Sequence, residues 1–165
     1  MEQDRRRFLI SGWKVGGAVL IGATAYTAYE ALRPLTSGAG GAKLEVGPPE
    51  SFPENTATYV PEGRLYVVNA KGDLLALSQR CPHLGCQVPY CDTSGRFECP
   101  CHGSIYDLGG EWIVGPAPRG MDRFDLTLSA TGTLVADTSK VIVGPPRGAK
   151  QFLTPPKGPS CVTTA

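Results

Sequence analysis

Both histidines of this chain lie in short segments that also carry cysteines. The chain has two histidines and six cysteines among 165 residues, and its segments 81–86 and 99–104 read CPHLGC and CPCHGS. Cysteine thiolates and neutral imidazoles are typical ligands of zinc and of iron-sulfur clusters. Two loops that each supply a cysteine and a histidine therefore predict a metal site.

Four side chains are the candidate metal ligands: Cys81, His83, Cys99 and His102. A pair of iron ions needs four protein ligands, and two imidazoles on one iron make the cluster less negative and raise its potential. Zinc is the competing metal, although zinc fingers usually pair cysteine with cysteine and histidine with histidine. A zinc site would also give no role to Cys86 and Cys101, two cysteines that stand at matched places in the two segments. A purely disulfide interpretation leaves both histidines without a role.

The sequence around these segments predicts a scaffold of β-strands. The chain has 21 glycines, 15 prolines and only 19% charged residues, a composition that favours short strands and turns. RLYVVNA and DLLALSQ flank Lys71-Gly72, and FDLTLSA and TLVADT flank Thr131-Gly132, so each pair predicts a hairpin. Because the hairpins bracket the cysteine region, we expect an all-β domain that carries the two loops at one end.

The N-terminal segment, residues 1–35, has the features of a membrane anchor. After Arg5-Arg6-Arg7 the chain is almost uncharged from Phe8 to Tyr29, a helix of about 33 Å against a hydrocarbon core of about 30 Å. The arginines predict a cytoplasmic N-terminus, with the rest of the chain outside. They also resemble a twin-arginine export signal. A cleaved secretory signal and a buried helix are the alternatives.

Beyond the anchor, the sequence divides into three further parts. Residues 36–43, TSGAGGAK, are small and predict a flexible hinge. Residues 44–143 hold the strand signals and the cysteine segments, and residues 144–165 form a tail rich in proline and glycine, expected to be an extended strap. A net charge of +1 gives no basic footprint for nucleic acid, so we expect no nucleic-acid partner.

With these motifs in view, the chain resembles the Rieske 2Fe-2S proteins of cytochrome bc and bf complexes over about residues 44–136. The resemblance implies an all-β Rieske domain, an antiparallel β-sandwich with a cluster-binding subdomain, attached to one N-terminal transmembrane helix. It also implies one 2Fe-2S cluster, with Cys81 and Cys99 on the buried iron and His83 and His102 on the outer iron. A disulfide between Cys86 and Cys101 would join the two loops and protect the ligand geometry.

The resemblance extends to residues around the cluster. Ser104 and Tyr106 stand where the family has hydroxyls that donate to a cluster sulfide and to a cysteine sulfur, which would raise the potential; the alternative is two ordinary strand residues. Leu84 and Gly85 would form an apolar tip where a quinol docks. The family's proline loop, otherwise a plain β-turn, would cover the cluster from a third side with Gly115, Pro116, Ala117 and Pro118.

Three residues depart from the family pattern. Pro82 replaces a small polar residue, with no threat to ligation, and Cys91 and Cys161 lie outside the four family cysteines. Export to an oxidising side makes a second disulfide between Cys91 and Cys161 a hypothesis that would fix the tail near the cluster. Two free thiols, or a lipidated or intersubunit cysteine, are the alternatives.

The resemblance implies an electron-transfer subunit of a quinol:cytochrome c or plastocyanin oxidoreductase, which is not catalytic alone. His83 and His102 would contact the quinol and accept its proton, while the domain moves on the hinge between the quinol site and a c-type haem. A cytochrome b-type subunit, a c-type cytochrome and quinol are the implied partners, in a dimeric multisubunit membrane complex. The alternatives are the small Rieske subunit of an arsenite-oxidase-like enzyme and a membrane-anchored zinc and disulfide module without redox function.

Overall fold

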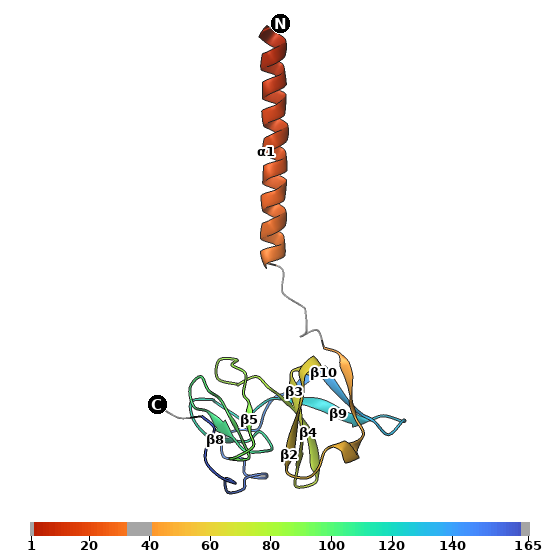
Figure 1. The fold of residues 1–165 in the computed structure, drawn as a ribbon, viewed down its shortest axis with the longest axis vertical. Helices are drawn as coiled ribbons and strands as arrows, with labels where there is room; N and C mark the ends of the chain where they lie inside the picture. The colour runs from red at the N-terminus through yellow and green to blue at the C-terminus, as the bar shows by residue number, and fades with distance from the viewer. Residues whose placement is uncertain (1, 33–40, 163–165) are drawn as a thin grey trace. The chain divides into compact units, whose positions relative to one another are not determined.

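The protein consists of an N-terminal helix and a β domain (Figure 1). The computed structural model describes residues 2–32 and 41–162. The helix belongs to one compact unit, Met1–Thr36, and the strands to a second, Ser37–Ala165. Most of the predicted hinge, residues 36–40, lies outside the described residues. Its last residues are bound to the β domain, since the Ala42 N–H donates to Thr138 Oγ1 at 2.9 Å and Lys43 begins the first strand.

Helix α1 spans Glu2–Leu32, 31 residues, or about 46 Å at 1.5 Å per residue. Its segment Gln3–Leu32, which contains an 18-residue window with a mean hydropathy of 1.4, is long and apolar enough to cross a membrane. Large apolar side chains such as Phe8, Trp13 and Leu20 are exposed along it. A helix that is apolar on all sides is suited to a lipid environment.

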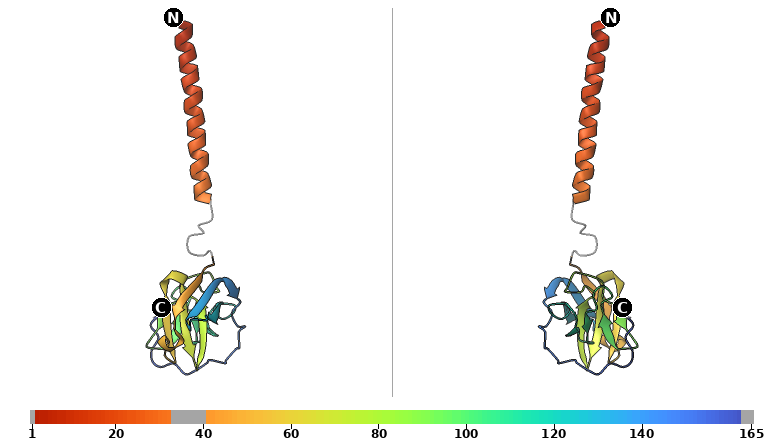
Figure 2. Two further views of the ribbon diagram at one scale, coloured as in Figure 1. Left: turned by 90° about the vertical axis from the view of Figure 1, so that its right-hand side faces the viewer. Right: turned by 90° about the vertical axis from the view of Figure 1, so that its left-hand side faces the viewer.

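The larger sheet of the β domain is antiparallel and has six strands in the order β1-β10-β9-β4-β3-β2. Its strands are β1 (Lys43–Gly47), β2 (Thr56–Val60), β3 (Leu65–Ala70), β4 (Asp73–Ser78), β9 (Arg123–Leu128) and β10 (Leu134–Ile142). Two short 3-10 helices, η1 (Pro49–Ser51) and η2 (Pro61–Gly63), flank β2. Figure 2 shows the strands of this domain from two further sides.

Both predicted hairpins are confirmed. Strands β3 and β4 pair from Leu65 opposite Ser78 to Ala70 opposite Asp73. The two turn residues, Lys71 and Gly72, have φ values of 57° and 91°, the left-handed backbone that a two-residue hairpin turn requires. Strands β9 and β10 pair across the second predicted turn.

A smaller antiparallel sheet is inserted between β4 and β9, which are themselves neighbours in the large sheet. Its strand order is β5-β6-β7-β8, with β5 (Tyr90–Cys91), β6 (Arg96–Glu98), β7 (Ile105–Tyr106) and β8 (Trp112–Val114). Because β4 and β9 are paired, they hold the two ends of the insertion together. The cysteine-histidine segments lie in this insertion, so the large sheet is the base on which they are mounted.

Strand β3 separates two hydrophobic cores. Leu65 and Val67 point into a core within the large sheet, whereas Val68 and Ala70 point into a core shared with the inserted subdomain. The alternation follows from the two-residue period of a strand. The second core also contains Cys81, Cys99 and Tyr106, so the subdomain's packing and the cysteine positions depend on the same contacts.

The tail is an extended segment that binds the subdomain. Residues 144–162, its described part, contain no strand or helix. Its Phe152 is buried, and the N–H groups of Phe152 and Lys157 donate to Glu111 Oε2 and to the Ser94 carbonyl at 3.0 and 2.9 Å. These contacts hold the described part of the tail against the subdomain.

Candidate metal centre

The two cysteine-histidine segments form loops with the same backbone hydrogen bonds. The first loop connects β4 to β5 and the second connects β6 to β7. In each, the N–H of the first cysteine, Cys81 or Cys99, donates at 2.8 Å to the carbonyl five residues later. The carbonyl of that cysteine accepts from the glycine four residues later, Gly85 at 2.9 Å or Gly103 at 3.1 Å. The segments are therefore equivalent in structure as well as in sequence.

The first cysteine of each loop is a buried free thiol. Cys81 and Cys99 are 3% and 2% exposed and form no disulfide. Burial raises the pKa of the Cys99 thiol, as does the neighbouring Cys81. A bound cation would stabilise the thiolate of Cys99 against this burial, so the buried pair is suited to a metal and not to surface reactivity.

The two imidazoles lie next to each other on the outer side of the loops. The ring centroids of His83 and His102 are 4.9 Å apart and the rings are nearly perpendicular, at 89°. His83 is half-buried and His102 is exposed. Leu84, beside His83, is 71% exposed. Two buried thiols and two imidazoles that are closer to the surface form a donor set that fits a 2Fe-2S cluster whose two irons differ in ligand type.

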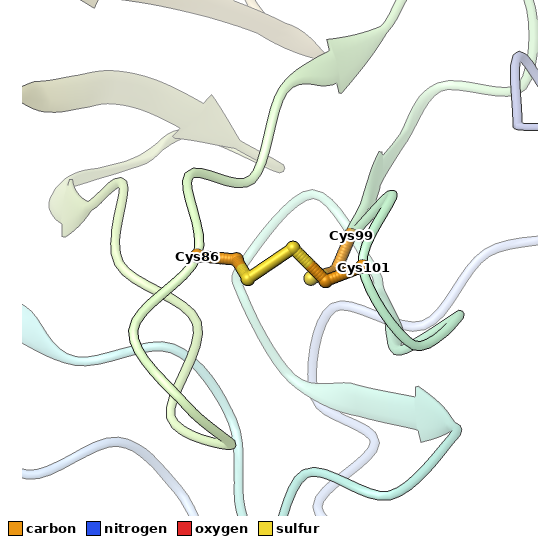
Figure 3. Close-up of side chains that lie close together, drawn as sticks. All are labelled: Cys86, Cys99 and Cys101. Atoms are coloured by element: carbon orange, nitrogen blue, oxygen red, sulfur yellow. A yellow bond between two sulfur atoms is a disulfide. The ribbon is translucent and has the colours of Figure 1, made fainter.

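A disulfide joins Cys86 of the first loop to Cys101 of the second, with Cα atoms 6.7 Å apart. Figure 3 shows this bond beside the Cys99 side chain. The three sulfurs lie within 4.8 Å of one another. The disulfide implied by the resemblance is thus confirmed, and it closes the two loops against separation.

Two buried hydroxyls, one at the end of the second loop and one on the strand that follows it, lie near the site. Tyr106, on β7, is fully buried and its Oη lies 3.1 Å from Cys81 Sγ. Burial, together with the Cys81 side chain, raises the pKa of Tyr106, so its hydroxyl is protonated and can donate to a thiolate. Ser104, also fully buried, accepts from the Ala117 N–H at 3.1 Å.

Loop 115–118 packs against the second cysteine-histidine loop. Gly115 has a φ of 104°, and a Cβ there would lie 2.5 Å from the Ser104 Cα. Only glycine allows this approach. Trp112 Nε1 donates to the Gly115 carbonyl at 3.1 Å and Ala117 is fully buried. The structure thus brings the predicted proline loop onto the second loop.

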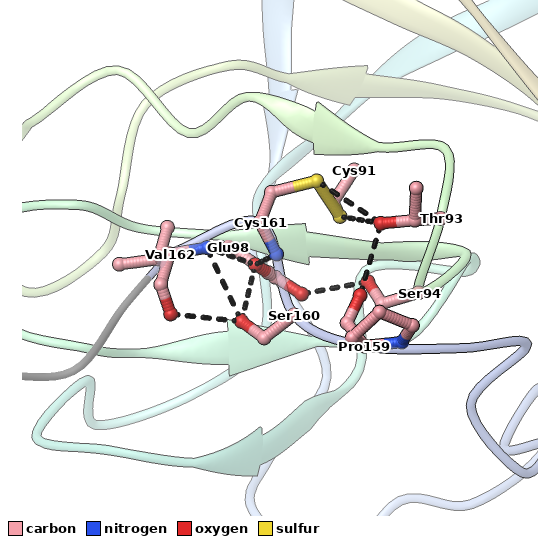
Figure 4. The surroundings of a disulfide bond; sticks show 8 residues. All are labelled: Cys91, Thr93, Ser94, Glu98, Pro159, Ser160, Cys161 and Val162. Carbon is pink, nitrogen blue, oxygen red and sulfur yellow. Dashed lines mark hydrogen bonds between the residues drawn. A yellow bond between two sulfur atoms is a disulfide. The ribbon is translucent and has the colours of Figure 1, made fainter.

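A second disulfide joins Cys91 of β5 to Cys161 of the tail. Beside it lies the buried carboxylate of Glu98 (Figure 4). Ser94 and Ser160 donate to this carboxylate at 2.6 and 2.7 Å, and the backbone N–H groups of residues 161 and 162 donate at 2.8 and 3.0 Å. Burial opposes ionisation, but these hydrogen bonds outweigh it and lower the pKa of Glu98. The hypothesis of a second disulfide is confirmed. The hydrogen bonds of Glu98 help this disulfide to hold the end of the tail against the subdomain.

Buried carboxyl groups lie behind the second loop. Asp107 and Glu111 are 2% and 3% exposed, and Asp107 Oδ1 accepts from the Glu111 N–H at 2.8 Å. Burial, and the Glu111 side chain next to it, raise the pKa of Asp107 to about 7. Sequence reasoning missed both residues, which lie among turn residues that predict an exposed surface. It also missed Glu98, because three of its hydrogen-bond donors lie in the distant tail. For Asp107 and Glu111, the only available signal was the position of two carboxyl groups on either side of Gly109 and Gly110.

Comparison with known proteins identifies the domain. The Rieske [2Fe-2S] domain family matches residues 42–125. The cytochrome b6-f complex iron-sulfur subunit of Synechococcus sp. (strain JA-2-3B'a(2-13)) is 34% identical over 141 residues, covering 74% of this chain and 81% of the relative. The subunit of the same name from Prochlorococcus marinus (strain MIT 9312) is 32% identical over 154 residues, covering 82% of this chain and 86% of the relative.

Two solved structures are also similar. A chain of a hyperthermophilic respiratory Complex III matches with 26% identity and a TM-score of 0.45, over 76% of this chain and 97% of that chain. The plasma membrane Rieske protein of Synechocystis PCC 6803 matches with 30% identity and a TM-score of 0.40, over 49% and 83%.

The sequence matches agree with the buried thiols, the paired imidazoles and the disulfide between the loops. The matches to cytochrome b6-f iron-sulfur subunits do not favour the two alternatives, an arsenite-oxidase-like subunit or a zinc module. The helix α1 adds a candidate single membrane span. The chain therefore belongs to the Rieske family and is a 2Fe-2S electron-transfer protein.

Proposed function

We propose that this chain accepts one electron, coupled to one proton, from a membrane quinol and passes it to a c-type cytochrome or to plastocyanin. The observation that carries this proposal is the difference in exposure between the two sides of the site. Its two thiols are buried at 3% and 2% exposure, while His102 and the apolar Leu84 face outward. An electron donor can therefore reach the imidazole side but not the sulfur side.

The proposed ligands are Cys81 and Cys99 for the buried iron and His83 and His102 for the outer iron. The bound cluster supplies one-electron redox chemistry. Tyr106 holds a hydroxyl at the Cys81 sulfur and stabilises the additional negative charge of the reduced state. Ser104 would donate in the same sense to a cluster sulfide, because its Oγ accepts from Ala117 and its own proton stays available.

The imidazoles are the proposed proton acceptors. Each ring has a second nitrogen that does not bind iron, and this nitrogen would accept a hydrogen bond from a quinol hydroxyl. Leu84 and Gly85 would supply the apolar contact for the quinol ring beside them.

The proposed partners are a cytochrome b-type subunit, a c-type cytochrome and quinol, in a dimeric membrane complex. The similarity to cytochrome b6-f iron-sulfur subunits and the apolar length of α1 support this proposal. The arginines at 5–7 precede the apolar stretch, which favours a cytoplasmic N-terminus and a β domain on the outer side. The same arginines would serve as a twin-arginine export signal.

The decisive experiment is low-temperature EPR of the dithionite-reduced full-length chain, followed by redox titration at several pH values. We expect a Rieske-type spectrum and a midpoint potential that falls with rising pH by about 59 mV per unit once one proton accompanies one electron. A Rieske spectrum with a low potential that does not change with pH would contradict quinol oxidation. Bound zinc and no iron signal would contradict the cluster itself.

A further inference from the structure

Loop 115–118 is held on its outer side by one arginine of the tail. Arg147 Nε donates to the Ala117 carbonyl at 2.9 Å, and its Nη2 lies 2.7 Å from the same carbonyl and 3.2 Å from that of Gly115. The guanidinium carbon lies 4.5 Å from the centroid of the Trp112 ring. Trp112 itself donates to the Gly115 carbonyl at 3.1 Å. One side chain therefore binds two carbonyls of the loop and stacks on its neighbour.

The inner side of the same loop contacts the metal site. The Ala117 N–H donates to Ser104 Oγ at 3.1 Å, and Ser104 lies two residues after His102. Gly115 packs against the backbone at residues 103 and 104. A shift of the loop would therefore change the hydrogen bonding of Ser104. A single residue, Ala117, therefore connects the exposed Arg147 to the buried hydroxyl of Ser104.

The backbone of the tail fixes the position of Arg147. The neighbouring Pro145 carbonyl accepts from the Gly120 N–H at 2.8 Å, and Pro146 pairs with Arg119. Farther along, Phe152 is buried and Cys161 is joined to Cys91. The guanidinium thus projects from a segment bound on both sides of it. This arrangement lowers the entropy that its side chain loses when it binds the loop.

The chemistry of this contact is particular to arginine. A planar guanidinium has several N–H donors in a fixed arrangement and stacks well on an aromatic ring. A lysine ammonium has the same charge but is a single, strongly hydrated centre on a flexible chain. It would not hold two carbonyls and the indole face at once.

We propose that Arg147 is a positioning residue for the iron-sulfur site. From the tail it holds loop 115–118 against the second cysteine-histidine loop, and so keeps the Ser104 hydroxyl oriented and the third side of the site closed. This inference rests on the proposed function, since it concerns how the chain sets the potential of its cluster.

The test compares Arg147→Lys and Arg147→Met in the full-length, cluster-loaded chain. The first measurement is hydrogen exchange of the Ala117 amide, the donor to Ser104. We expect this amide to exchange on the order of tenfold faster in both variants, because the hydrogen bonds from a charged donor are lost. The second measurement is the midpoint potential, which we expect to fall in both variants as Ser104 loses its orientation. A fall in Arg147→Lys cannot come from lost charge.

The matched control is Arg96, which also donates to a tail carbonyl, that of Thr154 at 3.3 Å, but does not contact loop 115–118. Arg96→Lys and Arg96→Met should leave Ala117 exchange and the potential as in the wild-type chain. If the Arg96 variants show the same changes, the effect belongs to the whole tail and the inference is wrong.

Two further outcomes would overturn the inference. One is an Arg147→Lys variant with wild-type exchange and wild-type potential, which would reduce the role of Arg147 to its charge. The other is a potential that rises in either variant. If Arg147→Met does not fold, Arg147→Lys alone decides. Failure of the proposed function is distinguishable, because the wild-type chain would then lack the Rieske spectrum, whereas Ala117 exchange can be measured in any case.

Discussion

The hydroxyl of Tyr106 lies 3.1 Å from the sulfur of Cys81, although 25 residues separate the two in the chain. One belongs to β7 and the other to the first cysteine-histidine loop, so the small sheet supplies a hydrogen-bond donor to the opposite loop. Both residues are buried, at 0% and 3% exposure. A hydrogen bond shielded from water in this way is stronger than one at the surface.

Replacing Tyr106 by phenylalanine should lower the midpoint potential. The variant keeps the ring in the core and removes only the donor that stabilises the reduced, more negative state. We expect a fall on the order of tens of millivolts, because one hydrogen bond contributes about 1 kcal/mol. Redox titration followed by EPR measures it. Tyr59→Phe, at an exposed position, is the control, and an unchanged or higher potential in Tyr106→Phe would show that the hydroxyl does not donate to the cluster.

Removing the disulfide between the loops should release iron. In the double variant Cys86→Ser with Cys101→Ser, the loops lose a bond across 15 residues, which contributes about 3 kcal/mol through the unfolded chain. We expect faster loss of iron on warming, measured by absorbance and by iron content. The control is Cys91→Ser with Cys161→Ser, which removes the tail disulfide and leaves the loops joined. Equal rates of iron loss in the two double variants would contradict a protective role of Cys86–Cys101.

Glu98→Gln should loosen the end of the tail. The glutamine cannot accept from two serine hydroxyls and two backbone N–H groups as a carboxylate does, and we expect the free energy of unfolding to fall by about 2 kcal/mol. Denaturant unfolding at neutral pH measures the loss. The exposed Glu54→Gln should change stability little.

The acid dependence of the same residue provides a second check. The pKa of Glu98 is lowered in the folded chain, so its contribution is present above the ordinary glutamate pKa of about 4 and is lost as the pH falls through the lower, folded value. The difference in stability between wild type and Glu98→Gln should therefore shrink on acidification. A difference that is independent of pH would assign the effect to packing.

Asp107 should make stability fall as the pH rises from about 4 to about 7. Burial raises its pKa to about 7, so between these values the folded chain binds a proton that the unfolded chain has lost. The loss is at most about 4 kcal/mol. The groups around it are the Glu111 carboxyl and Arg123, which donates to the Gly109 carbonyl at 3.0 Å. In Asp107→Asn the decline should be smaller, as measured by denaturant unfolding across this range, whereas the exposed Asp92→Asn should keep it.

The parts of the fold that the sequence predicts are those with a local signal. The hairpins β3–β4 and β9–β10 are encoded by alternating apolar residues around Lys71-Gly72 and Thr131-Gly132. The short strands β5 to β8 have two or three residues each, too few to show a period of two. They form because the cysteine loops, the disulfides and the shared core hold them together.

The residues of the site also divide into those that the sequence predicts and those that it does not. The residue types in the two loops predict the metal chemistry, and a resemblance to a family supplies the pairing of Cys86 with Cys101. The pairing of Cys91 with Cys161 stayed one of several alternatives, because residues 70 positions apart give no geometric signal. Arg147, Glu98 and Asp107 could not be found, since each acts through contacts that only the folded tail and the inserted subdomain create.

The two disulfides close overlapping rings of backbone, one from residue 86 to 101 and one from 91 to 161. Any single backbone cut between residues 86 and 161 therefore leaves two fragments that are still covalently joined. A protease that nicks an exposed turn between these residues would not detach either cysteine-histidine loop. This topology lets a nicked domain keep both halves of its metal site together.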